Sequence, residues 1–484
     1  MDKFKQELKE RKQEALLGYL GSLEEKDQEL IRNQFEKQGV EHIFESFAKA
    51  VKYNEGLTEA SKGMEIIPPP LLDHAEIMNG FTDPKVPVKT LKVSSLPENL
   101  RDYLREVGEC ALRNGEVAVV IVAGGQGTRL GYDGPKGAYV MPLPSSASIY
   151  EILMKRIGAL NKLMAPTEGE QKCVPVYVMV SPQNEAKTEE HFKANDYFGL
   201  DPRSVNFFAQ ATMPSFDKND GSVLFEDPLT LTQNANGNGG VFAALKSSGM
   251  QDDMVRRGVK YVHFHGIDNV LCKSAEPLFI GACIAAGVTA GNKCCTKSGP
   301  HEKVGVQVIK RVGDKYFPSV VEYTELSSEQ AEEKDTQGNL TYSAGNIVNH
   351  FFRLSHLREM DLNYHVAVKK VPYYDYAGSK QLVTPTEPNA IKIEYFIFDA
   401  FEAANNLLVV ETNRPEEFSP VKNATGTDSP DSATKDICNL HTLYLKHAGI
   451  LEANDNNLYE IAPGETYAGE GLTKATKYQK LNQA

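Results

Sequence analysis

A glycine-rich turn after an apolar run is the part of the chain best suited to bind phosphate. Residues 119–131 read VVIVAGGQGTRLG, and GPKG follows at 134–137. The β-branched run predicts a buried strand, and the glycines allow backbone N–H groups to approach a ligand closely. Arg129 and Lys136 then place positive charge where phosphate oxygens would lie. This order of residues predicts a nucleoside-triphosphate site.

The spacing of the glycines excludes two other kinds of nucleotide site. A dinucleotide fingerprint requires a third glycine where this chain has Leu130. A Walker loop requires a glycine before its lysine, whereas Pro135 precedes Lys136. The A-G-G-x-G-T-R-L and G-P-K segments instead resemble the first motif of the nucleotidyltransferases that make nucleotide sugars.

The bulk composition narrows the class of protein and its partners. The chain has 484 residues, 41% of them hydrophobic and 24% charged, which is typical of a soluble globular protein with two or three domains. A net charge of −13 argues against nucleic acid or an anionic membrane surface as a partner. No apolar stretch is long enough to span a bilayer. The seven cysteines are odd in number and fit no zinc spacing, which predicts reduced thiols and a cytoplasmic location.

From Gly115 onward, strand-like and helical patterns alternate along the chain. The paired strand and helix segments are 117–122 with 148–164, 174–180 with 184–195, 205–208 with 239–247, and 259–265 with 275–286. This alternation predicts an α/β, Rossmann-like fold that binds its ligand beyond the carboxyl ends of the strands. Residues 300–372 look antiparallel, with a hairpin at Gly313-Asp314, so we expect a mixed sheet. The predicted segments are an N-terminal helical domain (1–108), a catalytic nucleotidyltransferase domain (109–403) and a small C-terminal domain (404–484).

Further motifs follow the phosphate loop in a recognisable order. They are Gly237–Gly240, His265–Asn269, Val304–Val306, Val321–Tyr323, Ala344–Ile347, Glu394–Phe401 and Pro420–Asn423. Over nearly the whole chain, their order and spacing resemble the eukaryotic UDP-N-acetylglucosamine pyrophosphorylases. That family makes UDP-N-acetylglucosamine and pyrophosphate from UTP and N-acetylglucosamine-1-phosphate with Mg²⁺. The resemblance implies the same substrates, products and metal for this chain.

The resemblance also implies roles for individual residues, motif by motif. The uracil and nucleotide backbone would be held by Ala123, Gly124, Gly125 and Gln210. Both nucleotide and sugar would be contacted by Gly237 and Asn238. The sugar hydroxyls and amide would be bound by Gly305, Glu322, Tyr323 and Asn346, and the N-acetyl pocket would be lined by Phe396 and Phe398. The phosphates would be held by Lys136 and Lys422, and Mg²⁺ by Asp268 and Asp399.

Nucleotidyl transfer is an in-line displacement at the α-phosphorus, and the sugar phosphate is already an anionic nucleophile. The barrier is charge repulsion plus alignment, so catalysis requires positioning and electrostatics but no general base. Arg129 offers a planar fork for the leaving pyrophosphate, and Lys136 and Lys422 offer mobile point charges. Asp268 is of the right type for Mg²⁺, which takes one or two carboxylates and completes its shell with water and phosphate.

Structural roles compete with these assignments. Asp268 is also suited to cap the following turn. On a continuous strand, Phe396 and Phe398 would share a face and Asp399 would point away from Phe398, while Glu322 and Tyr323 would point to opposite faces. A pair such as Phe396 and Phe398 is common in a core. His263 and His265 would share a face, but no third ligand lies nearby, so structural histidines are favoured over zinc.

Two other functions remain open from the sequence. One is a pyrophosphorylase of wider range, acting on N-acetylgalactosamine-, glucose- or galactose-1-phosphate, because an unfilled acetyl pocket discriminates by only a few kcal/mol. The other is a non-catalytic UDP-sugar sensor, which would bind the nucleotide sugar without transfer. The presence of every expected charge argues against the sensor. An oxidoreductase is disfavoured because the loop departs from the dinucleotide pattern.

Overall fold

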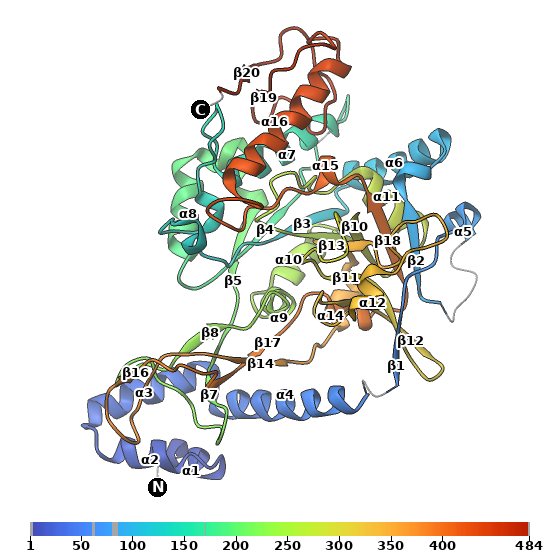
Figure 1. Ribbon diagram of the computed structural model, residues 1–484. Helices are drawn as coiled ribbons and strands as arrows, with labels where there is room; N and C mark the ends of the chain where they lie inside the picture. Colours follow the sequence, from blue (N-terminus) through green and yellow to red (C-terminus); the bar gives the residue numbers. More distant parts are fainter. Residues whose placement is uncertain (1–2, 61–62, 80–85, 170, 483–484) are drawn as a thin grey trace. The chain divides into compact units, whose positions relative to one another are not determined.

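The structure is a computed structural model that describes residues 3–60, 63–79, 86–169 and 171–482. The chain divides into two compact units (Figure 1). Unit 1 comprises Met1–Met64, Gln210–Ala243 and Asp361–Ala400. Unit 2 comprises Glu65–Ala209, Ala244–Met360 and Phe401–Ala484. Each unit is therefore assembled from segments that lie far apart in the sequence.

Unit 2 is built on one large mixed sheet, whose main path runs β2-β18-β10-β13-β9-β3-β4-β5. These strands are β2 (Val88–Lys92), β18 (Leu407–Thr412), β10 (Ala290–Thr296), β13 (Ala344–Arg353), β9 (Tyr261–Gly266), β3 (Val117–Val122), β4 (Val176–Val180) and β5 (Val205–Ala209). β13 is antiparallel to both neighbours, and the other pairs along the path are parallel. All of these strands except β13 end at one edge, where α/β sheets bind their ligands. The predicted mixed α/β sheet is confirmed.

The sequence of β3 explains its central place in this sheet. Val117–Ile121 are all buried, so the strand needs cover on both faces. On one face, Val119 and Ile121 share a core with α6 (Glu98–Arg113), α7 (Ile149–Leu163) and α11 (Pro277–Ala285). Alternation directs Tyr177 of β4 to the opposite face, where its hydroxyl donates to Asp253 of α10 (Met250–Arg256) at 2.7 Å. Helices therefore cover both faces of the sheet.

Helices α6 and α11 pack with their backbones in contact. A Cβ on Gly281 would lie 1.7 Å from the carbonyl oxygen of Leu104, and one on Gly108 would lie 1.9 Å from that of Pro277. Only glycine permits so close an approach. The contact fixes the start of α11 against the middle of α6, and so places the residues before α11 relative to the first turns of α6.

The predicted hairpin at Gly313-Asp314 is confirmed. β11 (Val306–Val312) and β12 (Lys315–Val321) pair antiparallel from Val306↔Val321 to Val312↔Lys315. Gly313 has a φ of +60°, which glycine adopts without strain. Val306 also pairs with Gly345 of β13, so the hairpin continues from the main sheet.

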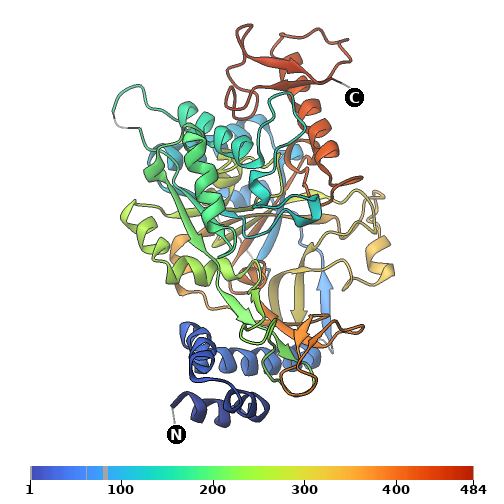
Figure 2. The same ribbon diagram turned by 90° about the vertical axis from the view of Figure 1, so that its left-hand side faces the viewer.

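The remaining elements of unit 2 surround this sheet. They are α5 (His74–Asn79), α8 (Glu185–Ala194), α12 (Ser328–Glu332), α13 (Leu354–Glu359), α15 (Arg414–Glu417), α16 (Pro430–His447), β19 (Tyr459–Ile461) and β20 (Tyr478–Lys480). β19 and β20 form an antiparallel pair that lies with α16 in the red part of Figure 2. Ser429 caps α16 in a capping box with Ser432, which explains why this helix begins after the polar loop.

Unit 1 combines the N-terminal helices with small strands from two later segments. The helices are α1 (Lys3–Glu10), α2 (Glu14–Gly21), α3 (Glu25–Gln38) and α4 (Val40–Ala60). The strands are β6 (Thr212–Pro214), β7 (Phe216–Asp217), β8 (Gln233–Ala235), β14 (His365–Lys369), β15 (Tyr373–Tyr374), β16 (Leu382–Val383) and β17 (Ala390–Glu394). The Tyr19 hydroxyl donates to the carbonyl oxygen of Pro228 at 2.8 Å, and Phe35, Phe216 and Phe225 share one core.

The two units do not follow the three predicted segments 1–108, 109–403 and 404–484. β2 lies in the first segment and β18 in the third, yet the two pair parallel in the main sheet, with Leu407 opposite Val88. Three elements cross a unit boundary: β1 (Met64–Ile67), α9 (Gly240–Ser247) and α14 (Asp399–Glu402).

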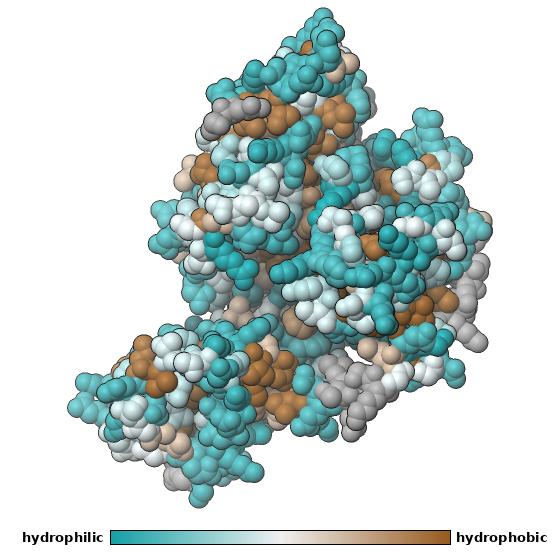
Figure 3. All heavy atoms as spheres, in the orientation of Figure 1, coloured by the Kyte–Doolittle hydropathy of each residue, from teal (hydrophilic) through white to brown (hydrophobic). Residues whose placement is uncertain are grey.

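The face drawn in Figure 3 is mainly hydrophilic, with hydrophobic residues in scattered groups. Among the described helices, none is both apolar enough and long enough to cross a bilayer.

Candidate active site

The predicted phosphate loop connects the end of β3 to the first turns after it. The loop closes on itself, because the N–H of Gly127 donates to the carbonyl oxygen of Gly134 at 2.9 Å and Gln126 forms a β-bridge with Pro135. A Cβ on Gly127 would lie 2.8 Å from the ring of Tyr132, so the fold requires glycine there. The closed loop brings Lys136 back beside Gly125, to whose carbonyl oxygen its N–H donates at 3.3 Å.

Asn184, which belongs to none of the sequence motifs, holds the backbone of this loop. Asn184 donates through Nδ2 to the carbonyl oxygens of Gly124 and Gly125, at 3.3 and 3.2 Å. Ala123 continues the sheet, since its N–H donates to the carbonyl oxygen of Met179 at 2.9 Å. Residues 123–125 are thus fixed at the carboxyl edge of the sheet, where the nucleotide is expected.

Lys136 is the electrostatic centre of the predicted catalytic groups. Burial disfavours its charged form, the carboxylate of Asp268 favours it, and the positive charges of Lys422 and Arg129 disfavour it further. The net effect is a pKa below the ordinary value for lysine. The backbone agrees with this, because the N–H of Ile267 donates to the carbonyl oxygen of Val122 at 3.1 Å and so sets Asp268 beside the start of the phosphate loop. Arg129, Lys136, Lys422 and Asp268 all belong to unit 2.

Asp268 lies just beyond the end of β9 and has room for its carboxylate because residue 266 is glycine. A Cβ on Gly266 would lie 2.6 Å from Asp268 Oδ1. Among the described residues, the Asp268 carboxylate makes no hydrogen bond or ion pair, and the turn-capping role is taken by Asn269, whose Oδ1 accepts from the N–H of Leu271 at 3.3 Å. A half-buried carboxylate with free oxygens fits Mg²⁺, which takes few protein ligands.

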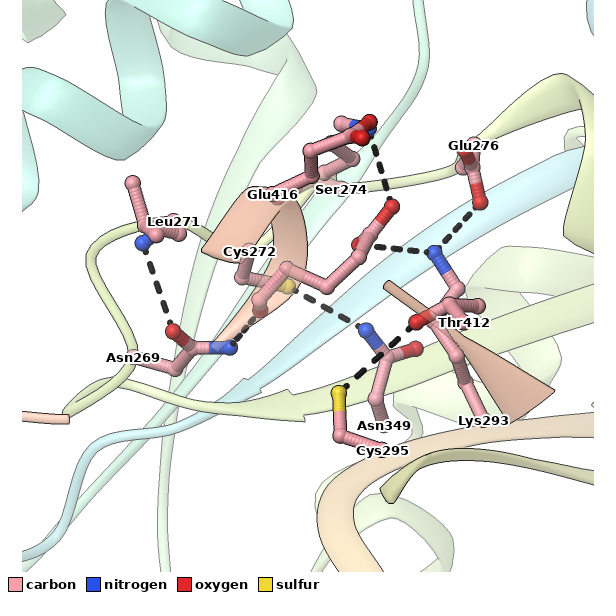
Figure 4. Close-up of polar contacts among 12 residues, drawn as sticks. Asn269, Leu271, Cys272, Ser274, Glu276, Lys293, Cys295, Asn349, Thr412 and Glu416 are labelled. Atoms are coloured by element: carbon pink, nitrogen blue, oxygen red, sulfur yellow. Dashed lines mark hydrogen bonds and ion pairs between the residues drawn. The ribbon is translucent and has the colours of Figure 1, made fainter. Parts of the chain in front are cut away.

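Asn269 also ties the segment that carries Lys422 to Asp268. Its Oδ1 accepts from the N–H of Ser419 at 3.0 Å, and it forms a β-bridge with Pro420 (Figure 4 shows Asn269). The N–H of Val421 then donates to the carbonyl oxygen of Asp268 at 2.9 Å. These contacts place Lys422 next to Asp268, although the two residues are far apart in sequence.

The Lys422 ammonium itself is held only loosely. It lies 5.6 Å from the ring centroid of Phe418 and 3.9 Å from Asp428 Oδ2, and about 40% of its side chain is exposed. A cation that is positioned but weakly paired remains available for a phosphate. Phe418 and Asp428 had no signal in the sequence that would have connected them to Lys422.

Part of the predicted sugar site is also assembled within unit 2. The N–H of Asn346 donates to the carbonyl oxygen of Gly305 at 2.8 Å, and a Cβ on Gly305 would lie 3.9 Å from Glu322 Oε1. Glu322 and Tyr323 follow the end of β12 instead of continuing it, so the expectation of opposite strand faces is wrong. Tyr323, the fourth predicted sugar residue, is exposed.

Unit 1 contains the other predicted nucleotide and sugar residues. Asn238 Oδ1 accepts from the N–H of Ile397 at 3.0 Å. Gly237 has a φ of +86°, and a Cβ there would lie 2.3 Å from the carbonyl oxygen of Tyr395. The structure therefore packs the Gly237-Asn238 turn against the segment that carries Phe396 and Phe398. Gln210 is buried in the same unit.

The placement of Phe396, Phe398 and Asp399 corrects a strand assumption. β17 ends at Glu394, so Phe396 and Phe398 lie in the connection to α14, where their rings stack with centroids 5.2 Å apart, and Asp399 is the first residue of α14. The ring of His365 lies 4.7 Å from that of Phe396, and its Nε2 lies 2.7 Å from Asp399 Oδ2. The Asp399 carboxylate therefore has a protein partner, unlike that of Asp268.

His263 and His265 are structural histidines, as predicted. His263 Nδ1 accepts from the N–H of Ala275 at 2.8 Å, and its other ring nitrogen is hydrogen-bonded to Asn349. His265 Nε2 accepts from the Ser274 hydroxyl at 2.9 Å, and burial lowers the pKa of His265 to about 4. Within the described part of the chain, no group of three or more His, Cys, Asp and Glu side chains is placed to hold a metal.

Comparison with known proteins shows which proteins the whole chain is similar to. Residues 86–464 match the family described as UTP–glucose-1-phosphate uridylyltransferase. The chain is 37% identical over 467 residues to the Saccharomyces cerevisiae UDP-N-acetylglucosamine pyrophosphorylase, covering 94% of this chain and 92% of that protein. It is 41% identical over 387 residues to the Xenopus tropicalis UDP-N-acetylhexosamine pyrophosphorylase-like protein 1, covering 75% and 74%. The crystal structure of the Trypanosoma brucei uridine diphosphate N-acetylglucosamine pyrophosphorylase with an inhibitor superposes with a TM-score of 0.78 at 28% identity, over 96% of this chain and 93% of that one.

Proposed function

The chain belongs to the UTP–glucose-1-phosphate uridylyltransferase family, and we propose that it transfers the uridylyl group of UTP to N-acetylglucosamine-1-phosphate. The products are UDP-N-acetylglucosamine and pyrophosphate. The sugar assignment is supported by relatives that cover most of the chain and act on N-acetylated sugars by name. One observation carries the mechanism: the N–H of Val421 donates to the carbonyl oxygen of Asp268, which places Lys422 beside Asp268 at the edge of the sheet that holds the loop of Arg129 and Lys136.

These groups suit an in-line displacement. An oxygen of the sugar phosphate forms a bond to the α-phosphorus of UTP, and the bond from that phosphorus to the pyrophosphate oxygen breaks. No proton needs to move, so the residues act by holding phosphates and offsetting negative charge. We assign Arg129 to the leaving pyrophosphate and Lys136 and Lys422 to the phosphates. Bound phosphate would favour the charged form of Lys136, which the protein alone disfavours.

Asp268 is the residue that we propose holds Mg²⁺. When bound there, the metal would supply positive charge to the phosphate oxygens of UTP. The free carboxylate oxygens support this role, and only glycine at position 266 leaves room for that carboxylate. Asp399 is retained as a second candidate ligand, although His365 already contacts it.

Substrate recognition divides among the remaining residues. Ala123, Gly124, Gly125 and Gln210 are proposed to bind the uracil and nucleotide, and Gly237 and Asn238 to bind nucleotide and sugar. The residues proposed to bind the sugar ring are Gly305, Glu322, Tyr323 and Asn346, and those proposed to contact the acetyl group are Phe396 and Phe398. An apolar acetyl pocket discriminates by only a few kcal/mol, so related N-acetylhexosamine phosphates are expected as weaker substrates. We also propose a cytoplasmic location, which the seven free cysteines support.

Pyrophosphate release tests this function. The full chain is mixed with UTP, Mg²⁺ and one of four sugar-1-phosphates: N-acetylglucosamine, N-acetylgalactosamine, glucose or galactose. We expect the highest kcat/KM with N-acetylglucosamine-1-phosphate. A higher value with another sugar would keep the mechanism and overturn the sugar assignment. Binding of UDP-N-acetylglucosamine without release from any sugar would identify a sensor instead of an enzyme.

A further inference from the structure

A large cavity opens at the carboxyl edge of the main sheet. Its volume is about 550 Å³, within the range of roughly 300–1,000 Å³ that small-ligand sites occupy. Its walls come from the ends of β18 and β10, the first turns of α6, the residues before α11, and residues 413–417. No residue of the proposed transfer site lines it, and the whole cavity belongs to unit 2.

Two arginines one turn apart on α6 face this cavity with donors to spare. Arg101 Nη2 donates to the carbonyl oxygen of Val93 at 3.0 Å, but its Nε is buried and has no hydrogen-bond partner. Arg105 is exposed and makes no ion pair among the described residues. A guanidinium presents a planar fork that matches the oxygens of a phosphate or carboxylate. The pair therefore forms the anion-binding wall of the cavity.

The opposite wall offers acceptors. Glu411 and Glu416 line the cavity. Glu411 accepts from Thr296 Oγ1 at 3.3 Å and lies 3.8 Å from Lys92 Nζ, and Glu416 accepts from Asn413 Nδ2 at 2.8 Å and lies 3.7 Å from Lys273 Nζ. Each carboxylate keeps further acceptor sites, because an ionised carboxylate has about four. Carboxylate oxygens of this kind accept from hydroxyl groups. They also repel a ligand with many negative charges. A fitting ligand therefore has one anionic group that the arginines bind and several hydroxyl groups that donate to the carboxylates. A phosphomonoester of a polyol, such as a sugar phosphate, has both.

Three lining residues, Lys273, Glu276 and Glu417, belong to a buried network of charges around Lys293 (Figure 4 shows Lys293 and Glu276). Lys293 is fully buried between Glu276 and Glu417, and its Nζ lies 3.0 Å from Glu417 Oε2. Lys273 Nζ lies 2.9 Å from Glu417 Oε1. Burial opposes the charged form of Lys293, but the two glutamates outweigh it and raise its pKa. Removing one member would leave a buried charge unpaired, so the network holds α15 in one position.

The same segment leads directly to the catalytic groups. The carbonyl oxygen of Glu417 accepts from Asn269 Nδ2 at 2.7 Å, and Asn269 Oδ1 holds Ser419. Lys422 follows three residues later, next to Asp268. A ligand that shifts residues 413–417 would therefore shift the anchor of Lys422. Coupling of this kind acts in both directions between two sites.

We propose that this cavity is an effector site for a hydroxylated phosphomonoester, and that its occupancy alters uridylyl transfer through Asn269 and Lys422. The binding part stands on the cavity alone, whereas the coupling part rests on the proposed function. The site is separate from the transfer site, and its arginines take no part in the reaction.

Isothermal titration of the full chain tests the binding part, with glucose 6-phosphate as the probe. This compound has no anomeric phosphate and so cannot replace the sugar-1-phosphate in transfer. Inorganic phosphate and glucose are titrated separately. We expect one glucose 6-phosphate per chain, and no binding of glucose alone. Equal affinity for inorganic phosphate would identify free phosphate as the ligand, and weaker affinity would show that the hydroxyls contribute.

Substitutions in the cavity test whether glucose 6-phosphate binds there. The double variant Arg101→Gln/Arg105→Gln should weaken glucose 6-phosphate at least tenfold with an unchanged melting temperature. The matched control Arg113→Gln, on the same helix but paired with Glu109 outside the cavity, should bind like the original protein. Unchanged affinity in the double variant would overturn the proposal. So would an apparent Kd that rises in proportion to added UDP-N-acetylglucosamine, because the probe would then occupy the transfer site.

Turnover tests the coupling part. Saturating glucose 6-phosphate should change kcat at least twofold at saturating substrates, and the double variant should lose this response while keeping its basal rate. Binding without any change in kcat or KM would overturn the coupling. Because binding is read by heat without turnover, an inactive protein would contradict the proposed function and leave the binding result intact.

Discussion

Two clusters of lysines at the same edge of the sheet have opposite electrostatic environments. Lys293 and Lys273 are buried against Glu276 and Glu417, and both have pKa values above the ordinary range because the glutamates outweigh burial. Lys136 is partly buried beside two other cations and one carboxylate, and its pKa lies below the ordinary value. Paired lysines stabilise the fold, whereas a crowded, underpaired lysine is ready to receive an anion.

The comparison shows how an acidic chain can bind a polyanion. The net charge is −13, yet at the transfer site the cations outnumber the carboxylates. Some of the negative charge of the chain is neutralised elsewhere, because the lysines of the buried network form ion pairs with Glu276 and Glu417. The first cluster then fixes residues 413–417, and the same segment continues to Lys422 in the second cluster.

Removing a charge from the buried network should have the largest effect on stability. Glu417→Gln leaves Lys273 and Lys293 short of one carboxylate, and we expect a loss of about 3–5 kcal/mol in unfolding free energy. Chemical denaturation measures it. The control Glu416→Gln removes a carboxylate that is 40% exposed and 3.7 Å from Lys273, and should cost about 0–1 kcal/mol. Equal losses in the two variants would show that the network is not stabilising.

The opposite pattern is expected at the transfer site. Lys136→Met should lower kcat roughly 10²–10³-fold, because it removes a charge that acts on the phosphates. The melting temperature of the free protein should stay the same or rise, since the lost charge was disfavoured there. Lys187→Met, on an exposed lysine 3.7 Å from Asp133, serves as the control and should change neither quantity. A large drop in melting temperature would assign Lys136 to structure.

A smaller effect on kcat is expected from adding a side chain at Gly266, next to the Asp268 carboxylate. Gly266→Ala places a methyl group where the Asp268 carboxylate now lies, 2.6 Å from Oδ1. Displacing that carboxylate should lower kcat roughly 10–100-fold and raise the Mg²⁺ concentration needed for half-maximal rate. Gly299→Ala, with no atom within 4 Å of the added Cβ, should leave both unchanged. An unaltered Mg²⁺ titration in Gly266→Ala would argue against Asp268 as the metal ligand.

The smallest effect is on the pH profile. Because the charged form of Lys136 is the active one and its pKa is lowered in the free protein, kcat/KM should decline at a lower pH than the ordinary lysine value of 10.5 would give. The unfolded chain binds this proton more tightly, so between the two pKa values this group makes the free protein more stable as pH rises. Lys136→Arg should move the alkaline decline upward. An alkaline decline at the same pH in Lys136→Arg would show that another group causes it.

Local patterns in the sequence predicted the parts of the fold that depend on residues adjacent in the sequence. The β-branched run before Gly124 and the Gly313-Asp314 turn both form the predicted structures. The ends of β12 and β17 were not predictable, because the alternation of apolar and polar residues continues past Val321 and an apolar run follows Glu394, although the strand pairing stops at these two residues. β2 was missed because its partner, β18, lies more than 300 residues later.

The residues that position the site were harder to find than those that touch phosphate. Arginine and lysine after a glycine turn have an evident chemistry. Asn269 and Glu417, in contrast, are 148 residues apart, and only the fold reveals that one orients the other. The same holds for His365 beside Asp399. Support of this kind depends on tertiary contact and carries no signal in local spacing.

Isotope exchange between pyrophosphate and UTP tests the central claim most directly, which is direct transfer to N-acetylglucosamine-1-phosphate by charges that hold phosphate. The full chain is incubated with UTP, Mg²⁺ and ³²P-labelled pyrophosphate, with and without the sugar phosphate. We predict labelled UTP only when N-acetylglucosamine-1-phosphate is present, because no uridylyl group is held covalently by the protein. Label entering UTP without the sugar phosphate would reveal a covalent intermediate and contradict the account.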